Sequence, residues 1–220
     1  MNAERTLANR TLLQLCVLTL IGSAFRLLPY YWSEEYKGWL FCLWGANAIL
    51  PLFLVGVSKS RYLWLGYAIP LTGLVISDLI IQIILQSRQL PASSLTGRLV
   101  TYSFFLLLAQ LGLILRWFKL SRFKTIMTGI GLSLTGSILF FLISNFLVWT
   151  QSTPAAGTFY YPPTWAGLIR CYEMGLPFFK NQFLSDGIFA LVFFSIFALL
   201  ESRIFNQASN PSVAKANAVR

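Results

Sequence analysis

The chain is built from long apolar runs separated by short polar segments. The runs cover residues 11–28, 39–57, 62–85, 99–117, 125–149 and 183–204. A helix rises 1.5 Å per residue, so about 20 apolar residues cross the roughly 30 Å hydrocarbon layer of a bilayer. The pattern therefore predicts an all-α integral membrane protein, a single bundle of about six transmembrane helices over residues 1–205.

Composition agrees with the bilayer as the solvent of this chain. Of 220 residues, 56% are hydrophobic and only 11% are charged, and the mean hydropathy is +0.67. Soluble domains carry about a quarter charged residues. The net charge of +10 would suit nucleic-acid binding, but the basic residues lie between the apolar runs and form no common face. We therefore expect the lipid bilayer as the partner of this chain and no nucleic acid.

The basic residues predict the orientation of the bundle, because cytoplasmic loops are enriched in Lys and Arg. If the runs alternate in direction, eleven of the 17 basic residues lie on one side and six on the other. The larger group includes both chain ends, so the N and C termini are expected in the cytoplasm. A multi-pass protein of a bacterial inner (plasma) membrane is expected.

Between the fifth and sixth runs, residues 150–182 are predicted to form an extracytoplasmic loop that acts as a lid. The segment carries Pro154, Pro162, Pro163 and Pro177, and residues 164–175 are expected to form a short helix within it. Residues 206–220, rich in Asn, Ala and Ser, are predicted to be a disordered tail. The first run also resembles a signal peptide, whose cleavage would leave five helices.

Polar residues inside apolar runs are the candidates for function, because ionisable groups in a bilayer are costly and usually face the protein interior. Arg26, Asp78, Asn145 and Asp186 come from four different runs. The predicted directions place all four in the outer half of the membrane, which indicates a site open to the outside. Two structural alternatives stay open: a simple Arg26–Asp78 ion pair, and Asp186 as a first-turn residue of its helix.

The residue types limit the chemistry of such a site. The chain has no histidine, and its three cysteines are far apart in sequence. These facts disfavour a serine-histidine triad and most zinc sites. No metal, cofactor or enzymatic activity is therefore expected, although two aspartates within hydrogen-bonding reach would form a dyad.

The outer segments also carry a family resemblance. The matching residues are Arg26 to Pro29, Ser77-Asp78, Ser144-Asn145-Phe146, Val148-Trp149, Tyr161-Pro162, Cys171-Tyr172, Leu176-Pro177-Phe178-Phe179, Asn181 and Asp186. With them the chain resembles an uncharacterised family of bacterial six-pass membrane proteins. That family is in turn similar to the substrate-capture (S) components of energy-coupling-factor vitamin transporters.

The resemblance implies a pocket on the outer side, closed by the extracellular loops over a small solute. Residue by residue, it implies a pocket with Arg26 and Asp78 nearby, lined or framed by Asn145, Trp149, Tyr161, Tyr172, Asn181 and Asp186. The expected function is binding of a small polar or cationic solute as the capture subunit of a transporter, with a membrane coupling subunit and an ATPase module as partners. The alternative is an accessory or structural subunit of a larger membrane complex with no solute site.

Overall fold

The structure, a computed structural model, describes residues 2–31, 48–90, 94–118, 120–154 and 160–208, and every regular element in them is a helix. The helices are α1 (Asn2–Tyr31), α3 (Ile49–Lys59), α4 (Leu63–Ser87), α5 (Leu95–Ala109), α6 (Gly112–Trp117), α7 (Arg122–Thr150) and α8 (Trp165–Ala208). Five segments are long and apolar enough to cross a membrane. The predicted all-α membrane bundle is confirmed, and the protein is a multi-pass membrane protein.

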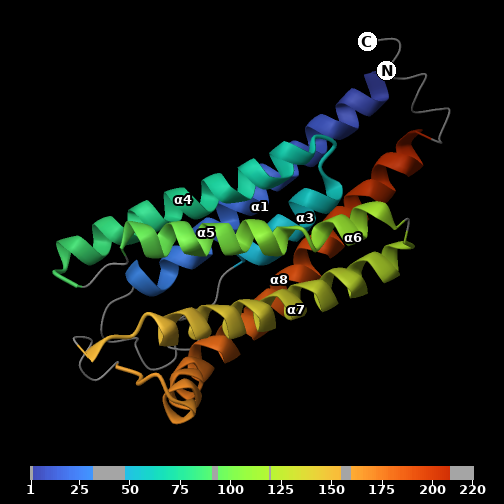
Figure 1. The fold of residues 1–220 in the computed structure, drawn as a ribbon. Coiled ribbons are helices and arrows are strands. Elements are labelled where there is room, and N and C mark those ends of the chain that lie inside the picture. Colours follow the sequence, from blue (N-terminus) through green and yellow to red (C-terminus); the bar gives the residue numbers. More distant parts are fainter. Residues whose placement is uncertain (1, 32–47, 91–93, 119, 155–159, 209–220) are drawn as a thin grey trace.

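The helices alternate in direction along the bundle. Helices α1, α4 and α7 run one way, while α5 with α6 and α8 run back (Figure 1). The start of α1 and the end of α8 lie at the same end of the bundle (Figure 1). We call this end the inner end, following the charge pattern, and the opposite end, where α1, α4 and α7 finish, the outer end.

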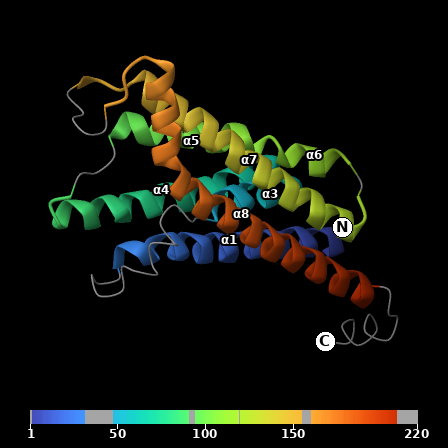
Figure 2. The ribbon, with the colours of Figure 1, turned by 90° about the horizontal axis from the view of Figure 1, so that it is seen from below.

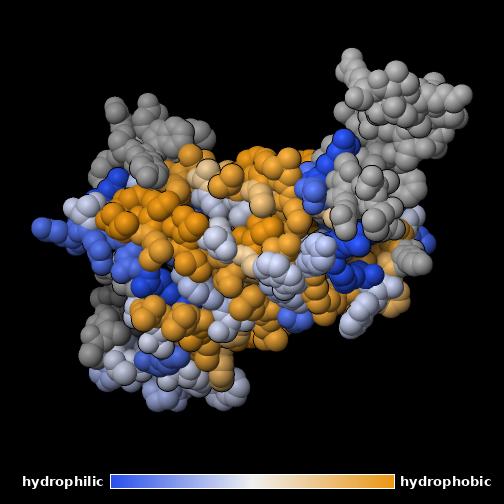
Figure 3. Space-filling view, turned by 90° about the horizontal axis from the view of Figure 1, so that it is seen from above, coloured by the Kyte–Doolittle hydropathy of each residue, from blue (hydrophilic) through white to orange (hydrophobic). Residues whose placement is uncertain are grey.

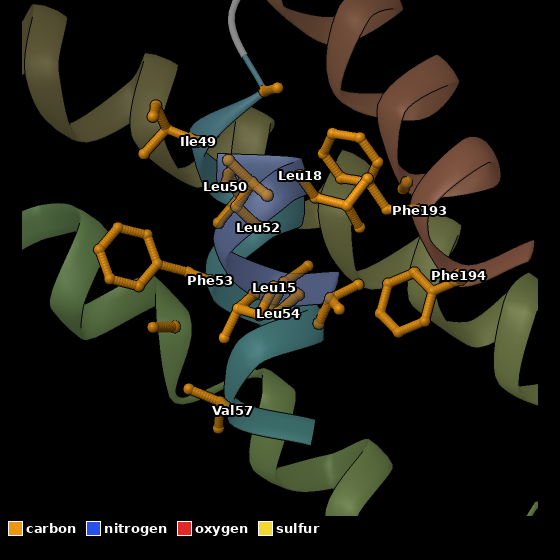
Figure 4. Close-up of a cluster of buried hydrophobic side chains, with 14 of the residues drawn as sticks. Leu15, Leu18, Ile49, Leu50, Leu52, Phe53, Leu54, Val57, Phe193 and Phe194 are labelled. Atoms are coloured by element: carbon orange, nitrogen blue, oxygen red, sulfur yellow. The ribbon is translucent and has the colours of Figure 1, made fainter. Parts of the chain in front are cut away.

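Helix α3 occupies the centre of the inner half. It has 11 residues and spans about 16 Å, roughly half of the hydrocarbon layer. Of the predicted span 39–57, residues 39–47 lie outside the described residues. All nine residues from Ile49 to Val57 are buried, and α3 contacts α1, α4, α5, α6, α7 and α8. Figure 4 shows its side chains enclosed by Leu15 and Leu18 of α1 and by Phe193 and Phe194 of α8.

Glycines bring the backbones around α3 into direct contact. A Cβ atom on Gly56 of α3 would lie 2.4 Å from the carbonyl oxygen of Gly66 on α4, and a Cβ on Gly66 would lie 2.4 Å from the Gly56 oxygen. Gly112 of α6 meets the Leu54 oxygen in the same way, at 2.9 Å. Small residues allow such approaches in membranes, where association depends on packing rather than on the exclusion of water.

Two predicted spans differ from the observed helices. The span 99–117 is confirmed as one candidate crossing, Leu95–Trp117, but it is divided into α5 and α6 by turns at Gln110 and Leu111. Helix α8 begins at Trp165, well before the predicted start at residue 183, and continues for 44 residues. Part of the predicted loop 150–182 is therefore helical, and α8 also includes residues 206–208 of the predicted tail.

Pro177 lies inside α8, where the sequence analysis placed a loop. Proline removes one backbone hydrogen bond and bends a helix instead of ending it when the flanking turns are held by packing. Figure 2 shows the early part of α8, drawn in orange, turned away from the direction of the rest of the helix. The segment that the sequence predicted as a lid lies beside the outer end of α7.

The surface has the distribution expected of a membrane protein. Large apolar side chains are exposed on several helices, among them Leu20, Leu107 and Ile188. In Figure 3 apolar residues cover much of the middle of the molecule, and hydrophilic residues are concentrated towards its two ends. This band is where lipid chains would contact the bundle.

Candidate functional site

One polar cluster lies at the outer end of α1 and α4. The Arg26 guanidinium forms an ion pair with Asp78, with 2.5 Å between Nη2 and Oδ1, and it donates a second hydrogen bond from Nη1 to Ser77 Oγ at 2.8 Å. The Arg26 and Asp78 side chains are 21% and 11% exposed. The phenol of Tyr102 on α5 interacts with the same carboxylate. We call Arg26, Ser77, Asp78 and Tyr102 the α1–α4 cluster.

The sequence explains why Arg26 and Asp78 meet. Gly73, one turn before Ser77 on α4, leaves no room for a side chain, because a Cβ there would lie 2.4 Å from Cγ2 of Thr19 on α1. The small residues Gly73 and Ser77 thus bring α4 against α1 just below the charged pair. An ionisable group in a bilayer needs such a partner, and the predicted ion pair is present in the structure.

A second polar cluster lies between α7 and α8 and contains Asp186, which is fully buried. Asp186 Oδ2 is 2.6 Å from Ser137 Oγ, and the Asp186 main-chain oxygen accepts a hydrogen bond from Ser133 Oγ at 3.1 Å. Ser137 Oγ is also 3.0 Å from the Ser133 carbonyl oxygen. Asp186 Oδ1 and Nε2 of Gln182, one turn earlier on α8, are also buried; the two side chains interact, although no hydrogen bond of good geometry joins these atoms. We call Ser133, Ser137, Gln182 and Asp186 the α7–α8 cluster.

Small residues on α7 create the space for this cluster. Gly129, Ser133, Gly136 and Ser137 are all buried. A Cβ on Gly129 would lie 2.5 Å from the ring of Phe194 on α8, and one on Gly136 would lie 2.6 Å from Leu50 of α3. The small residues Gly129, Ser133 and Ser137 of α7, spaced four apart, allow close packing against α8, and the two serines also place their hydroxyl groups beside Asp186.

The aromatic and amide residues implied by the resemblance hold the outer ends of α7 and α8 together. Trp149 Nε1 donates to the Pro162 carbonyl at 2.9 Å, and the Tyr172 hydroxyl donates to the Leu142 carbonyl at 2.8 Å. Asn145 Nδ2 donates to the Phe141 carbonyl of its own helix at 2.8 Å. These polar atoms are satisfied by backbone, so the structure gives them a positioning role.

The remaining predicted residues lie on the same outer segments. Tyr161 is buried, and its main-chain N–H donates to Ser152 Oγ at 2.8 Å. Asn181 lies half-buried on α8. Asn145 also contacts α8 directly, because a Cβ on Gly175 would lie 2.5 Å from Asn145 Oδ1. The structure thus brings Asn145 to α8 but does not join it to Asp186 by a hydrogen bond.

The eight predicted residues therefore fall into separate groups within the described part of the chain. The polar interactions of Arg26 and Asp78 involve α1, α4 and α5, and those of Asp186 involve α7. Helices α1 and α8 meet through the rings of Phe25 and Phe189, whose centroids are 4.9 Å apart. Phe25 directly precedes Arg26, and Phe189 lies three residues after Asp186, which indicates that the clusters lie at a similar depth on neighbouring helices.

Two grooves open at the outer end of the described structure. One, of about 570 Å³, lies beside the bend of α8 and is lined mainly by apolar side chains with Glu173 and Lys180 at its edge. The other, of about 210 Å³, is lined by Phe146, Trp149, Pro163, Thr164, Trp165 and Leu168. Trp149 is the predicted site residue that faces a groove. Neither groove is lined by Asp78 or Asp186.

Sequence reasoning missed the polar roles of Ser133, Ser137, Gln182 and Tyr102. The two serines were visible only as small residues spaced four apart, and the helical spacing of Gln182 and Asp186 was the signal for a shared face. In the described residues, His, Cys, Asp and Glu side chains form no group of three that could hold a metal ion.

Comparison with known proteins places the chain in a family. A family model described as a family of unknown function (DUF6580) matches residues 6–212, nearly the whole chain. The chain belongs to this family. No curated protein and no solved structure matches it. The matched residues include both polar clusters, and the description of the family assigns no ligand or reaction to them.

Proposed function

We propose that this DUF6580 protein is a membrane-embedded small-solute-binding protein, the substrate-capture subunit of a transporter in a bacterial inner membrane. The observation that carries the proposal is the α7–α8 cluster. Asp186 Oδ1 and Gln182 Nε2, an acceptor and a donor on the same helix, are buried and interact with each other without a hydrogen bond of good geometry. Buried polar groups that are incompletely satisfied cost free energy, so this pair points to a ligand that completes their hydrogen bonds.

The packing of the bundle supports access from the outside. The inner half is filled by α3, whose residues from Ile49 to Val57 are all buried among apolar neighbours. The described polar clusters lie in the outer half. A solute that reaches Gln182 and Asp186 would therefore come from the outer end, which fits a protein that captures a solute and presents it to other subunits.

The chemistry of the clusters suggests the solute class. Arg26 neutralises Asp78, so the α1–α4 cluster carries little net charge. The α7–α8 cluster offers one acceptor oxygen, one amide donor and two serine hydroxyls. This set suits a small polar solute with a hydrogen-bond donor next to an acceptor, and a cationic solute if Asp186 is ionised. A membrane coupling subunit and an ATPase module would supply the energy for transport.

Native mass spectrometry of the gently extracted protein tests this function. Wild type is compared with Gln182→Met, which removes the buried amide at similar volume, and with Gln86→Met, which makes the same exchange at an exposed position of α4. We expect a small-molecule adduct on wild type and Gln86→Met that is lost from Gln182→Met. An adduct that persists in Gln182→Met, or no adduct on any of the three, would contradict the proposal.

A structural function is the second candidate, and one observation favours it. The Tyr172 hydroxyl of α8 donates to the Leu142 carbonyl of α7, and the Trp149 indole of α7 donates to Pro162 in the segment before α8, as expected of an accessory subunit with no solute site. In that case the same spectra would show partner chains bound to the protein and no small-molecule adduct.

A further inference from the structure

The hydrogen bonds around Ser137 indicate the protonation state of Asp186. Ser137 Oγ lies 2.6 Å from Asp186 Oδ2 and 3.0 Å from the Ser133 carbonyl oxygen. Both distances are hydrogen-bond distances between oxygen atoms. A hydroxyl carries a single hydrogen and can donate only one bond. Its hydrogen can point at only one of these acceptors, so the geometry is satisfied best when the other contact obtains a hydrogen from elsewhere.

An ionised Asp186 leaves one of these contacts without a hydrogen. A carboxylate only accepts, and so does a carbonyl oxygen. The Ser137 hydrogen would serve one of them and leave two oxygens facing each other in a fully buried place. A neutral carboxylic acid satisfies both contacts: Asp186 Oδ2–H donates to Ser137 Oγ, and Ser137 donates to the Ser133 carbonyl. Ser133 Oγ donates separately to the Asp186 main-chain oxygen at 3.1 Å.

The surrounding helices supply no cation that would replace this proton. In the described structure the Asp186 carboxyl interacts with Ser137 of α7 and with the Gln182 amide of its own helix, and both of these side chains are neutral. From α1 the nearest charged group along the chain is Arg26, which pairs with Asp78. On α8 it is Lys180, which is exposed. The charged groups of the other packed helices lie in terminal turns at the inner end: Lys59 of α3, and Arg122 and Lys124 of α7.

We infer that Asp186 is a proton-binding site and that its proton closes α8 onto α7. Losing the proton would leave a charge between two helices, with only the neutral side chains of Ser137 and Gln182 beside it. Burying such a charge without a counter-ion is costly, so the ionised form favours separation of the outer parts of α7 and α8 and entry of water. This site does not depend on the proposed solute function, because a purely structural bundle would hold the same proton.

The sequence makes a direct test practical, since Asp78 and Asp186 are the only aspartates of the chain. Protein labelled with carbon-13 at the aspartate carboxyl gives two carboxyl signals in a nuclear magnetic resonance spectrum. At neutral pH we expect one signal at the position of a carboxylate, from Asp78, and one at the position of a neutral acid. The neutral-acid signal should vanish in Asp186→Asn. Two carboxylate signals in the wild type would overturn the inference.

A second measurement tests the effect of the proton on packing. Unfolding exposes Asp186 to water, where an aspartate is ionised near neutral pH, so unfolding releases a proton. Stability should then fall as pH rises, because the folded state binds more protons. We expect thermal unfolding of wild type and of the control Glu173→Gln, an exposed carboxyl on α8, to shift to lower temperature with rising pH. Asp186→Asn should lose most of this shift, and an unchanged shift in Asp186→Asn would contradict the inference.

Discussion

The two aspartates of this chain lie in the outer half of one bundle but in opposite surroundings. Asp78, in the α1–α4 cluster, has an arginine at 2.5 Å and retains slight exposure. Asp186, in the α7–α8 cluster, is fully buried with serine hydroxyls as its partners. A membrane protein can keep a carboxyl in its interior by pairing it with a cation or by keeping it neutral. The structure shows the first solution at Asp78, and the second is the one that we infer for Asp186.

The largest expected effect is on the α1–α4 cluster. Arg26→Met removes the cation and leaves Asp78 in a largely buried position without a counter-charge. Breaking a buried ion pair from one side typically costs about 3–5 kcal/mol. We expect a loss of that order in the free energy of unfolding, measured by denaturant titration in detergent micelles. Adding Asp78→Leu to Arg26→Met should recover part of the loss, and no recovery would show that Arg26 acts mainly through packing.

Replacing one serine in each cluster by alanine should change the unfolding free energy by different amounts. Ser137→Ala removes the hydroxyl that contacts Asp186 Oδ2 at 2.6 Å, and leaving a buried polar atom unpaired costs about 1–3 kcal/mol. Ser77→Ala should cost less, about 0.5–1.5 kcal/mol, since Asp78 keeps its ion pair with Arg26. Unfolding free energies of both variants, determined side by side, check the order. A larger loss in Ser77→Ala would reverse the comparison.

Replacement of each aspartate by asparagine tests the protonation difference directly. The amide of Asp186→Asn can donate to Ser137 Oγ as a neutral acid does, so we expect a change within about 1 kcal/mol. Asp78→Asn leaves Arg26 without its counter-charge and should destabilise clearly more. Equal losses in the two variants, measured in the same denaturant series, would mean that Asp186 is also ionised.

The smallest effect is expected at two glutamines. Gln182→Met replaces an amide whose interaction with Asp186 lacks good hydrogen-bond geometry, so the unfolding free energy should fall by no more than about 0.5 kcal/mol. The matched exchange Gln82→Met removes the oxygen that accepts a hydrogen bond from Arg98, and it should destabilise by about 1 kcal/mol. A clear loss in Gln182→Met would indicate a structural contact for that amide.

The membrane bundle was predictable because the length of each apolar run can be read from the sequence. The Arg26–Asp78 pair was predictable because a basic and an acidic residue inside apolar runs each need a partner. The boundary of α8 was not, since Pro177 reads as a loop signal and only packing against α7 shows that it bends a helix. The partners of Asp186 were also hidden. Whether Ser133 and Ser137 face Asp186 depends on the rotation and register of α7 against α8, which no spacing within either helix determines.

The central position of α3 has a consequence for the direction in which a solute could move through the bundle. Because its apolar side chains fill the inner half and Gly56 touches the backbone of Gly66, this half offers no polar path through the described structure. In the proposed capture function, a solute from the outer end would therefore stop at the apolar layer formed by α3. Its passage to the inner end would then require a partner subunit that displaces α3 from its neighbours.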